Sequence, residues 1–231
     1  MNGKHILILI LIIVSGALYY SWADSKMTSS YLEVIRIIDG DTVELEGNIR
    51  VRLLGINTPE KGMLKSGLAI EYLENNILSK KVKIVHFGSD KYGRILGYLF
   101  VNEININEVL LEKGFAHLYY YGKDRFYNEM FEAEKFARES KIGIWEESVN
   151  YECIRLLELK YNDDIYGKET LTLQNVCQKD IDVVIKDDAT HIYKRTLSTG
   201  IYEENFNHIF NQDGDSLYVW DDFGLVEFYR Y

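Results

Sequence analysis

The amino-acid sequence predicts a mainly β protein with some helix: a five-stranded barrel of the OB type with three helices, followed by a β-sandwich. The barrel is predicted by five strand-like segments within residues 31–147, with three helix-like segments between and after them. The sandwich is predicted by a change of pattern after Val149, where short alternating runs are separated by turn residues and no helical period persists. A chain of 231 residues with 47% hydrophobic residues can bury two such cores.

The barrel opens with a strand over residues 31–38, a break at Asp39-Gly40-Asp41 and a hairpin. A three-residue loop at residues 46–48 sets the hairpin register, because it pairs Glu44 with Arg50 and apolar residues with apolar residues. In this register Asp41 falls beside Arg52. We therefore expect a carboxylate and a guanidinium group to meet at the end of one hairpin.

The rest of the barrel follows from hydrophobic periodicity and turn residues. Its elements are a helix at about Gly67–Leu78, strands at Lys81–Phe87 and Ile95–Val101, a helix near Asn105–Lys113 that Gly114 ends, and a helix from about Asn128 to Ser140. The unit ends near Gly143-Ile144-Trp145.

The second unit, residues 148–231, is predicted from five alternating runs: Ile154–Leu159, Thr170–Leu173, Asp182–Ile185, Ser216–Trp220 and Leu225–Tyr229. Cys153 and Cys177 lie at equal distances on either side of Ile165, within a strand–turn–strand pattern. A hairpin centred there would place them opposite each other and allow a disulfide. Two free buried thiols are the alternative.

The first 23 residues differ from both units. Lys4 precedes a long apolar run without a polar face, so the segment is either a signal peptide or an N-terminal transmembrane anchor. Ser21-Trp22-Ala23 suits a cleavage site, whereas the apolar length of residues 5–23 suits a single-pass helix with Lys4 inside. Either alternative predicts an exported protein, secreted or anchored to the membrane, with residues 24–30 as a linker. Export also permits a disulfide.

The formal net charge of −10 lies mainly in the second unit, where residues 148–231 carry 16 acidic and 8 basic side chains. This balance argues against a protein that grips nucleic acid over a broad basic face. It leaves room for a local basic pocket.

Four separated motifs carry the functional signal: Ile38-Asp39-Gly40-Asp41-Thr42, residues 51–60, Asp90-Lys91-Tyr92-Gly93-Arg94 and Gly143-Ile144-Trp145. In order and spacing they resemble the staphylococcal nuclease-like (thermonuclease) family over residues 31–147. Each motif alone has a simpler explanation, such as an Asx turn at residues 39–41 or a surface ion pair at Arg52. Their joint occurrence in this order argues against those explanations.

The resemblance implies a calcium-dependent enzyme that hydrolyses phosphodiester bonds of DNA and RNA. It implies that Asp41, the side chain of Asn57 and the backbone carbonyl of Thr58 hold Ca²⁺, a cation that prefers such hard oxygen ligands. Phosphodiester hydrolysis also needs a positioned water, a base for its proton and cationic groups for the phosphoryl oxygens.

For those tasks the resemblance implies Glu60 as general base and Arg52 and Arg94 as the phosphate clamp, which a planar guanidinium suits. Tyr92 and Tyr120 are candidates for stacking on a nucleobase, with core and rim packing as the alternative.

Asn57 departs from the family pattern, which most often has aspartate there. An amide oxygen still binds calcium, but the site loses a formal negative charge, so we expect weaker binding and not its loss. Because the other site residues remain, we predict an active enzyme. One alternative is a catalytically weakened nucleic-acid or surface-binding module. Another is an envelope adhesin in which the acidic sandwich acts and the barrel is a spacer.

Within the second unit, residues 170–175, 185–193 and 211–221 resemble the lamin-tail domain, an immunoglobulin-like sandwich. The Gly-Trp that usually precedes the second motif is absent, and Val183-Val184 stands there instead. The resemblance implies a binding or tethering domain whose ligand the sequence does not identify.

Overall fold

The computed structural model describes residues 30–120, 122–161, 168–207, 209–212 and 214–231. The predicted signal peptide or anchor at residues 1–23 lies outside the described residues, as does the predicted linker except for Ser30. No helix within the described ranges is long and apolar enough to cross a membrane.

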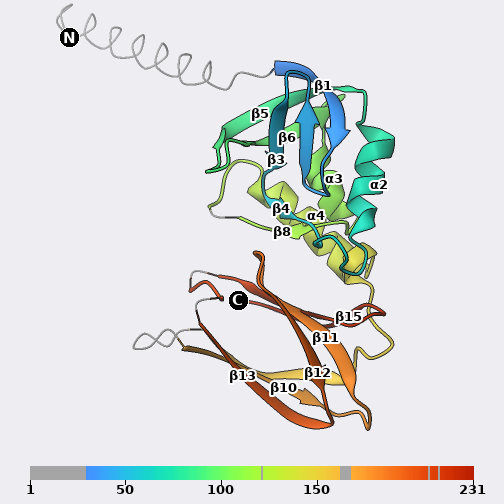
Figure 1. The fold of residues 1–231 in the computed structure, drawn as a ribbon, viewed down its shortest axis with the longest axis vertical. Coiled ribbons are helices and arrows are strands. Elements are labelled where there is room, and N and C mark those ends of the chain that lie inside the picture. The colour runs from blue at the N-terminus through green and yellow to red at the C-terminus, as the bar shows by residue number, and fades with distance from the viewer. Residues whose placement is uncertain (1–29, 121, 162–167, 208, 213) are drawn as a thin grey trace, which may run out of the picture.

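Five strands form the closed barrel that the sequence predicts (Figure 1). They are β1 (Ser30–Ile37), β2 (Thr42–Leu45), β3 (Ile49–Leu53), β5 (Lys81–Ser89) and β6 (Ile95–Val101). The order β3-β2-β1-β5-β6 is antiparallel at each step, and parallel pairing of β3 with β6 closes the barrel. A two-residue strand, β7 (Ile104–Asn105), extends the sheet beyond β6.

The predicted register of the first hairpin is confirmed, since Glu44 pairs with Arg50 and Thr42 pairs with Arg52. Gly47 and Asn48 in its loop have positive φ angles of 80° and 59°, as a tight loop of this kind requires. The fixed register places the end of β2, and with it Asp41, against β3.

Three helices complete the barrel unit and confirm the prediction: α2 (Gly67–Asn76), α3 (Ile106–Glu112) and α4 (Tyr127–Glu139). The side chain of Asn105 caps α3 by accepting a hydrogen bond from the backbone N–H of Asn107. Two short strands that the sequence did not indicate, β4 (Ile56–Asn57) and β8 (His117–Leu118), pair beneath the barrel. A 3₁₀ turn, η1 (Gly143–Trp145), ends the unit.

The second unit consists of two facing sheets with one core, as predicted. One sheet has the order β13-β10-β9 and the other β12-β11-β14-β15. The strands are β9 (Ile154–Lys160), β10 (Lys168–Asn175), β11 (Ile181–Lys186), β12 (Ile192–Leu197), β13 (Gly200–Asn207), β14 (Ser216–Trp220) and β15 (Leu225–Arg230). Leu171 and Leu173 of the first sheet pack with Ile185, Leu217 and Val219 of the second.

Cys153 and Cys177 form a disulfide, so the pairing expected from the hairpin is confirmed and the free-thiol alternative is wrong. The bond lies next to the pair of Ile154 and Asn175 at the open end of the β9–β10 hairpin. It links the start of the sandwich to the segment that enters β11.

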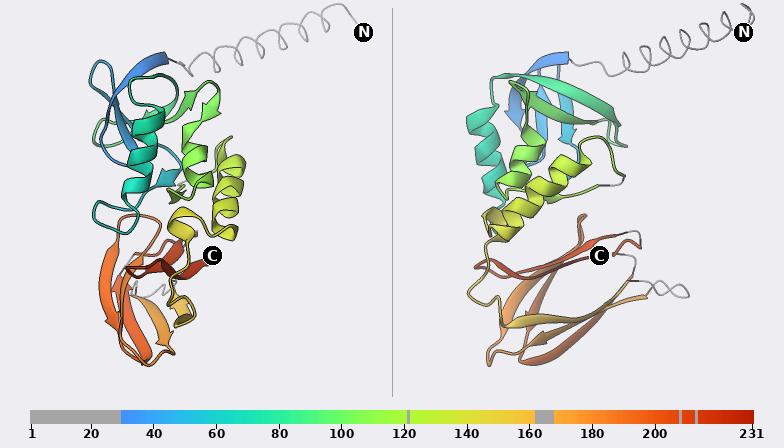
Figure 2. Two further views of the ribbon diagram at one scale, coloured as in Figure 1. Left: turned by 90° about the vertical axis from the view of Figure 1, so that its right-hand side faces the viewer. Right: turned by 180° about the vertical axis from the view of Figure 1, so that it is seen from behind.

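The two units share a third, smaller core. Trp145 and Ile144 of η1 pack there with Tyr218, Trp220 and Leu225 of the sandwich. Residues 146–148 also pair with the start of β15, because the N–H of Leu225 donates to Glu146 O and the N–H of Ser148 donates to Leu225 O, both at 2.8 Å. Figure 2 shows α4 on the side of the barrel that faces the sandwich.

Candidate active site

The hairpin end brings Asp41 and Arg52 together. The Nε atom of Arg52 lies 3.1 Å from Oδ1 of Asp41, and the backbone N–H of Leu53 donates to Asp41 O at 2.8 Å. Asp39 accepts a hydrogen bond from the backbone N–H of Asp41, so the Asx turn at residues 39–41 is present as well. The turn and the ion pair coexist, because the turn aims the Asp41 side chain into the barrel end.

Arg52 is held on three sides by protein groups. Its Nη1 donates to Leu53 O at 2.6 Å and to Ile56 O at 2.8 Å, and its Nη2 donates to Oδ1 of Asn57 at 3.2 Å. With Nε beside Asp41, one Nη2 hydrogen is left without a partner among the described residues. A phosphate can therefore meet Arg52 through Nη2, and the two-pronged clamp expected from a free guanidinium is not available.

Thr58 lies next to the Asp41 carboxylate, Asn57 lies next to the Arg52 guanidinium, and both are buried. The hydroxyl and the backbone N–H of Thr58 lie 3.3 and 3.4 Å from Oδ2 of Asp41. Asn57 belongs to β4, whose pairing with β8 opposes it to His117. The structure thus brings the three predicted calcium ligands to one place, around the head of Arg52.

Arg94 reaches the same place from the β5–β6 turn. Its Nε donates to Oδ2 of Asp90 at 2.7 Å, which fixes the guanidinium over that turn, and its Nη1 donates to the Thr42 hydroxyl at 3.4 Å. The same hydroxyl donates to Oδ1 of Asp41 at 3.1 Å. One threonine therefore separates Arg94 from the carboxylate that Arg52 contacts directly.

The two candidate stacking residues differ in setting. Tyr92 is 73% exposed, and the guanidinium of Arg94 lies 5.6 Å from the centre of its ring. Tyr120 is half-buried: its hydroxyl contacts that of Tyr98 and lies 3.2 Å from Asp124, and its ring packs closely on Gly55. A side chain at Gly55, where φ is +78°, would collide with that ring. Tyr92 is free to meet a ligand, whereas Tyr120 has a structural role in this arrangement.

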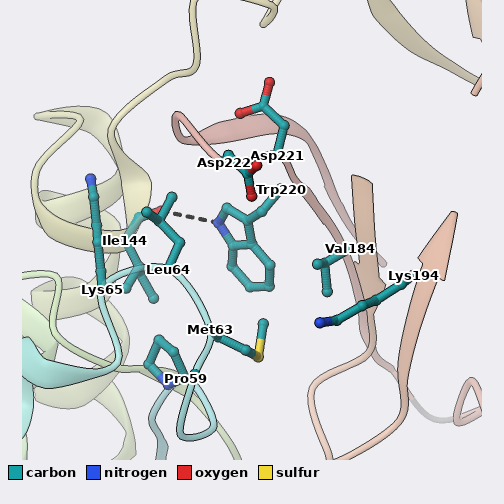
Figure 3. A pocket seen from close by; sticks show the side chains of 11 residues that line it. Pro59, Met63, Leu64, Lys65, Ile144, Val184, Lys194, Trp220, Asp221 and Asp222 are labelled. Carbon is teal, nitrogen blue, oxygen red and sulfur yellow. Dashed lines mark hydrogen bonds between the residues drawn. The ribbon is translucent and has the colours of Figure 1, made fainter. Parts of the chain in front are cut away.

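Glu60 is exposed at the start of a turn that follows β4. Both units support this turn: Met63 packs in the third core with Trp220 of the sandwich, and the Nζ of Lys65 donates to Gly143 O of η1 at 2.5 Å. Figure 3 shows Met63 pointing toward the Trp220 ring, whose Nε1 donates to Ile144 O, in a pocket of about 100 Å³ between the two units.

Burial dominates the electrostatics of Asp41. It raises the pKa of this carboxyl to about 6, the Arg52 guanidinium opposes the rise, and Asp39 adds to it. A buried carboxylate of this kind is stabilised in its charged form by a bound cation.

The oxygen donors around Asp41 have the chemistry that calcium prefers. The described residues contain no group of three or more His, Cys, Asp or Glu side chains that could hold a metal. They do offer the Asp41 carboxylate and the Asn57 amide oxygen, both at the Arg52 guanidinium, with Thr58 beside Asp41, and carboxylate, amide and backbone carbonyl oxygens are all hard donors. These residues fit a calcium ion that completes its shell with water, at lower site charge than a two-carboxylate site would have.

Sequence reasoning missed the groups that the sandwich adds around Asn57, at the candidate calcium site. The Nδ2 of Asn57 donates to Asp188 O at 3.1 Å and to Ala189 O at 2.9 Å. Lys186 is buried nearby, and burial lowers the pKa of its ammonium against the opposing effect of Asp187. His117 is buried and neutral because burial and then Lys186 hold its pKa well below the usual value.

Comparisons with known proteins cover the barrel unit. Residues 50–147 match the family model described as staphylococcal nuclease homologue. The chain is 35% identical over 138 residues to a micrococcal nuclease of Shigella flexneri, which covers 54% of this chain and 76% of that protein. It is 30% identical over 120 residues to an uncharacterised endonuclease of Escherichia coli, covering 50% of this chain and 76% of that protein. It is 29% identical over 133 residues to the thermonuclease of Staphylococcus hyicus, covering 52% of this chain and 79% of that protein.

Proposed function

The chain belongs to the staphylococcal nuclease homologue family and is a nuclease that hydrolyses phosphodiester bonds, and on that premise we propose an exported, calcium-dependent enzyme for DNA and RNA. The observation that carries the proposal is the convergence around Arg52 of Asp41 and Asn57, with Thr58 beside Asp41. Arg94 joins them through Thr42. These groups come from three separate segments of the chain, which a chance cluster of surface charges would not bring together.

In this proposal Asp41, the amide oxygen of Asn57 and the Thr58 carbonyl hold the calcium ion. Calcium in that position would neutralise charge that develops on the phosphoryl oxygens. Arg94 and the free Nη2 hydrogen of Arg52 bind the phosphate and orient it. The exposed Glu60 carboxylate takes a proton from the attacking water.

Position 57 does not indicate a decayed site. Its amide is buried, both hydrogens of Nδ2 donate to carbonyls, and Oδ1 accepts from Arg52 with a second lone pair left over, which is the behaviour of an organised polar group. We therefore favour an active enzyme over a catalytically weakened binding module.

We also propose export, for which the Cys153–Cys177 disulfide is the supporting observation, because disulfides persist in oxidising compartments. The protein would be secreted or held at the membrane by residues 1–23. The acidic sandwich, which resembles a lamin-tail domain, would bind or tether a further partner through surface that does not face the barrel.

Digestion of DNA and RNA by purified residues 27–231 tests the enzyme. We expect turnover in millimolar calcium, loss of turnover with a calcium chelator, and a fall of about 10²- to 10⁴-fold in kcat for Glu60→Gln. Glu74→Gln, at an exposed glutamate on α2, is the matched control and should match the wild type. Undiminished turnover in the chelator would refute calcium dependence, and equal kcat in the two variants would refute the role of Glu60.

A further inference from the structure

The sandwich touches the candidate site at Asn57. The two carbonyls that accept from its amide belong to Asp188 and Ala189, 131 and 132 residues further along the chain. Both residues lie in the turn between β11 and β12. Figure 1 shows this turn rising from the sandwich toward β4 and β8 of the barrel unit.

We propose that the sandwich forms one wall of the nuclease site, with Asn57 as the positioning residue that joins the wall to the pocket. The amide group is held from both ends, because its oxygen accepts from Arg52 and its nitrogen donates to the two carbonyls. The inference rests on the nuclease function proposed above and adds to it a structural role for the second domain beyond tethering.

The turn that presents the two carbonyls is fixed by its own hydrogen bonds. The buried ammonium of Lys186 donates to Asp187 O at 2.8 Å and to Ala189 O. The buried carboxylate of Asp187 accepts from the backbone N–H of His191 at 3.1 Å, and Asp215 accepts from the backbone N–H of Asp188 at 3.0 Å. The carbonyls are therefore set by the sandwich before they meet Asn57, which is the condition for a wall that orients another residue.

A second set of contacts leads from the β11–β12 turn back to the barrel unit, through α4 to β8. The Asp188 carboxylate accepts from the Tyr218 hydroxyl at 2.7 Å, and that hydroxyl in turn accepts from Nη2 of Arg230 at 3.1 Å. Arg230 contacts the buried Glu134 of α4, which accepts from the backbone N–H of Leu118 at 2.7 Å. Leu118 belongs to β8 and pairs with Ile56, the neighbour of Asn57, so the network ends on the strand pair that contains Asn57.

This arrangement explains why position 57 is an amide. The side chain must accept from a guanidinium and donate to two carbonyls, and asparagine does both. An aspartate of the same shape has no donor when ionised and would face two carbonyl oxygens at about 3 Å, a repulsive contact in a buried place. The loss of one carboxylate from the metal site is thus the consequence of docking the sandwich there.

Two isosteric substitutions, one from amide to carboxylate and one from carboxylate to amide, test the proposal on the full chain. Asn57→Asp removes the donor to the turn, whereas Asp41→Asn alters the charge of the same pocket without touching the sandwich. The readout is hydrogen exchange of the backbone N–H groups of Asp188 and His191, whose acceptors, Asp215 and Asp187, both belong to the sandwich. We expect exchange about tenfold faster or more in Asn57→Asp and within about twofold of the wild type in Asp41→Asn. Equal exchange of these amides in Asn57→Asp and the wild type, or an equal rise in both variants, overturns the proposal.

If Asn57→Asp does not fold, a second pair of variants decides. Tyr218→Phe removes the hydroxyl that fixes Asp188. Tyr202→Phe removes a hydroxyl of β13 that contacts Arg195 of β12 and Glu204 of β13. We expect Tyr218→Phe alone to speed exchange at Asp188 and to weaken calcium binding, measured by calorimetry, several-fold. Indistinguishable behaviour of the two variants overturns the proposal. Exchange is read without substrate, so a wild type that lacks turnover would refute the proposed function and leave this test intact.

Discussion

The ion pair between α4 and β15 provides the sharpest test of how firmly the two units are joined. Arg230 contacts both carboxylate oxygens of Glu134, and Glu134 is 0% exposed. In Arg230→Met the volume of the side chain is largely kept, but Glu134 becomes a buried carboxylate without a cation beside it. Removal of one partner of a buried pair costs about 3–5 kcal/mol.

The Arg230 side chain is 21% exposed, so water screens part of the pair and we take the lower end, about 3 kcal/mol. For a chain of this length each kcal/mol shifts the melting temperature by about 2–4 °C, which predicts a fall of about 6–12 °C. Thermal unfolding is followed by the fluorescence of Trp145 and Trp220, both of which lie in the shared core.

Arg195→Met is the matched control, because its partner Glu204 lies within the sandwich and both side chains are partly exposed. An exposed pair contributes about 0–1 kcal/mol, so the control should shift the melting temperature by less than about 4 °C. Adding Glu134→Gln to Arg230→Met should recover part of the loss, since it removes the unpaired charge and keeps an acceptor for the Leu118 N–H. A fall no larger than that of Arg195→Met, or no recovery in the double variant, would refute the reasoning.

Two further predictions concern binding and stability. Tyr92→Ala should raise KM for single-stranded substrate by about 5- to 150-fold, the equivalent of about 1–3 kcal/mol per stacked base. The melting temperature should stay unchanged because the ring is exposed. Tyr31→Ala, at another exposed tyrosine, is the control, and equal KM in the two variants would contradict stacking. Reduction of the Cys153–Cys177 disulfide, which spans a sequence separation of 24, should cost roughly 3–4 kcal/mol of unfolding free energy, and an unchanged denaturant midpoint after reduction would contradict this.

The barrel could be predicted because its signals are local. The three-residue loop and the opposite charges of Glu44 and Arg50 determine one register, and that register alone places Asp41 beside Arg52. The disulfide followed in the same way from the symmetry of a hairpin. Where a pattern repeats within about 20 residues, the sequence carries enough information to place side chains against each other.

The strands β12 and β13 could not be predicted from the same patterns. Charged residues such as Arg195 and Glu204 stand on the same faces of these strands as the core residues Leu197 and Phe206, and few of the strand positions are buried. Alternation of apolar and polar residues is therefore weak, although cross-strand pairing still forms the strands. The two-residue strands β4 and β8 are too short to show any period.

The junction of the two units could not be predicted from the sequence, because the residues that contact each other there are far apart in the chain and some of the contacts are made by backbone groups. Carbonyl groups such as those of Asp188 and Ala189 have no sequence signature. One signal was present in α4, where Glu134 stands four residues after Met130 and three before Ala137, within the buried stripe of the helix. A carboxylate in an apolar stripe needs a partner from another element, and here that partner is Arg230.

The side chain at position 57 therefore faces two surroundings, the proposed cation site and the β11–β12 turn, that favour different chemical groups. A cation at the Asp41 carboxylate is favoured by negative charge at 57, whereas the Asp188 and Ala189 carbonyls and the Arg52 guanidinium together require one group that both donates and accepts. An amide satisfies the second requirement completely and the first in part. Position 57 lies inside the region that matches the family model, residues 50–147, whereas Asp188 and Ala189 lie beyond it. The calcium affinity of this chain should accordingly be judged with the sandwich in place, since the wall it forms is what makes an amide the better residue at that position.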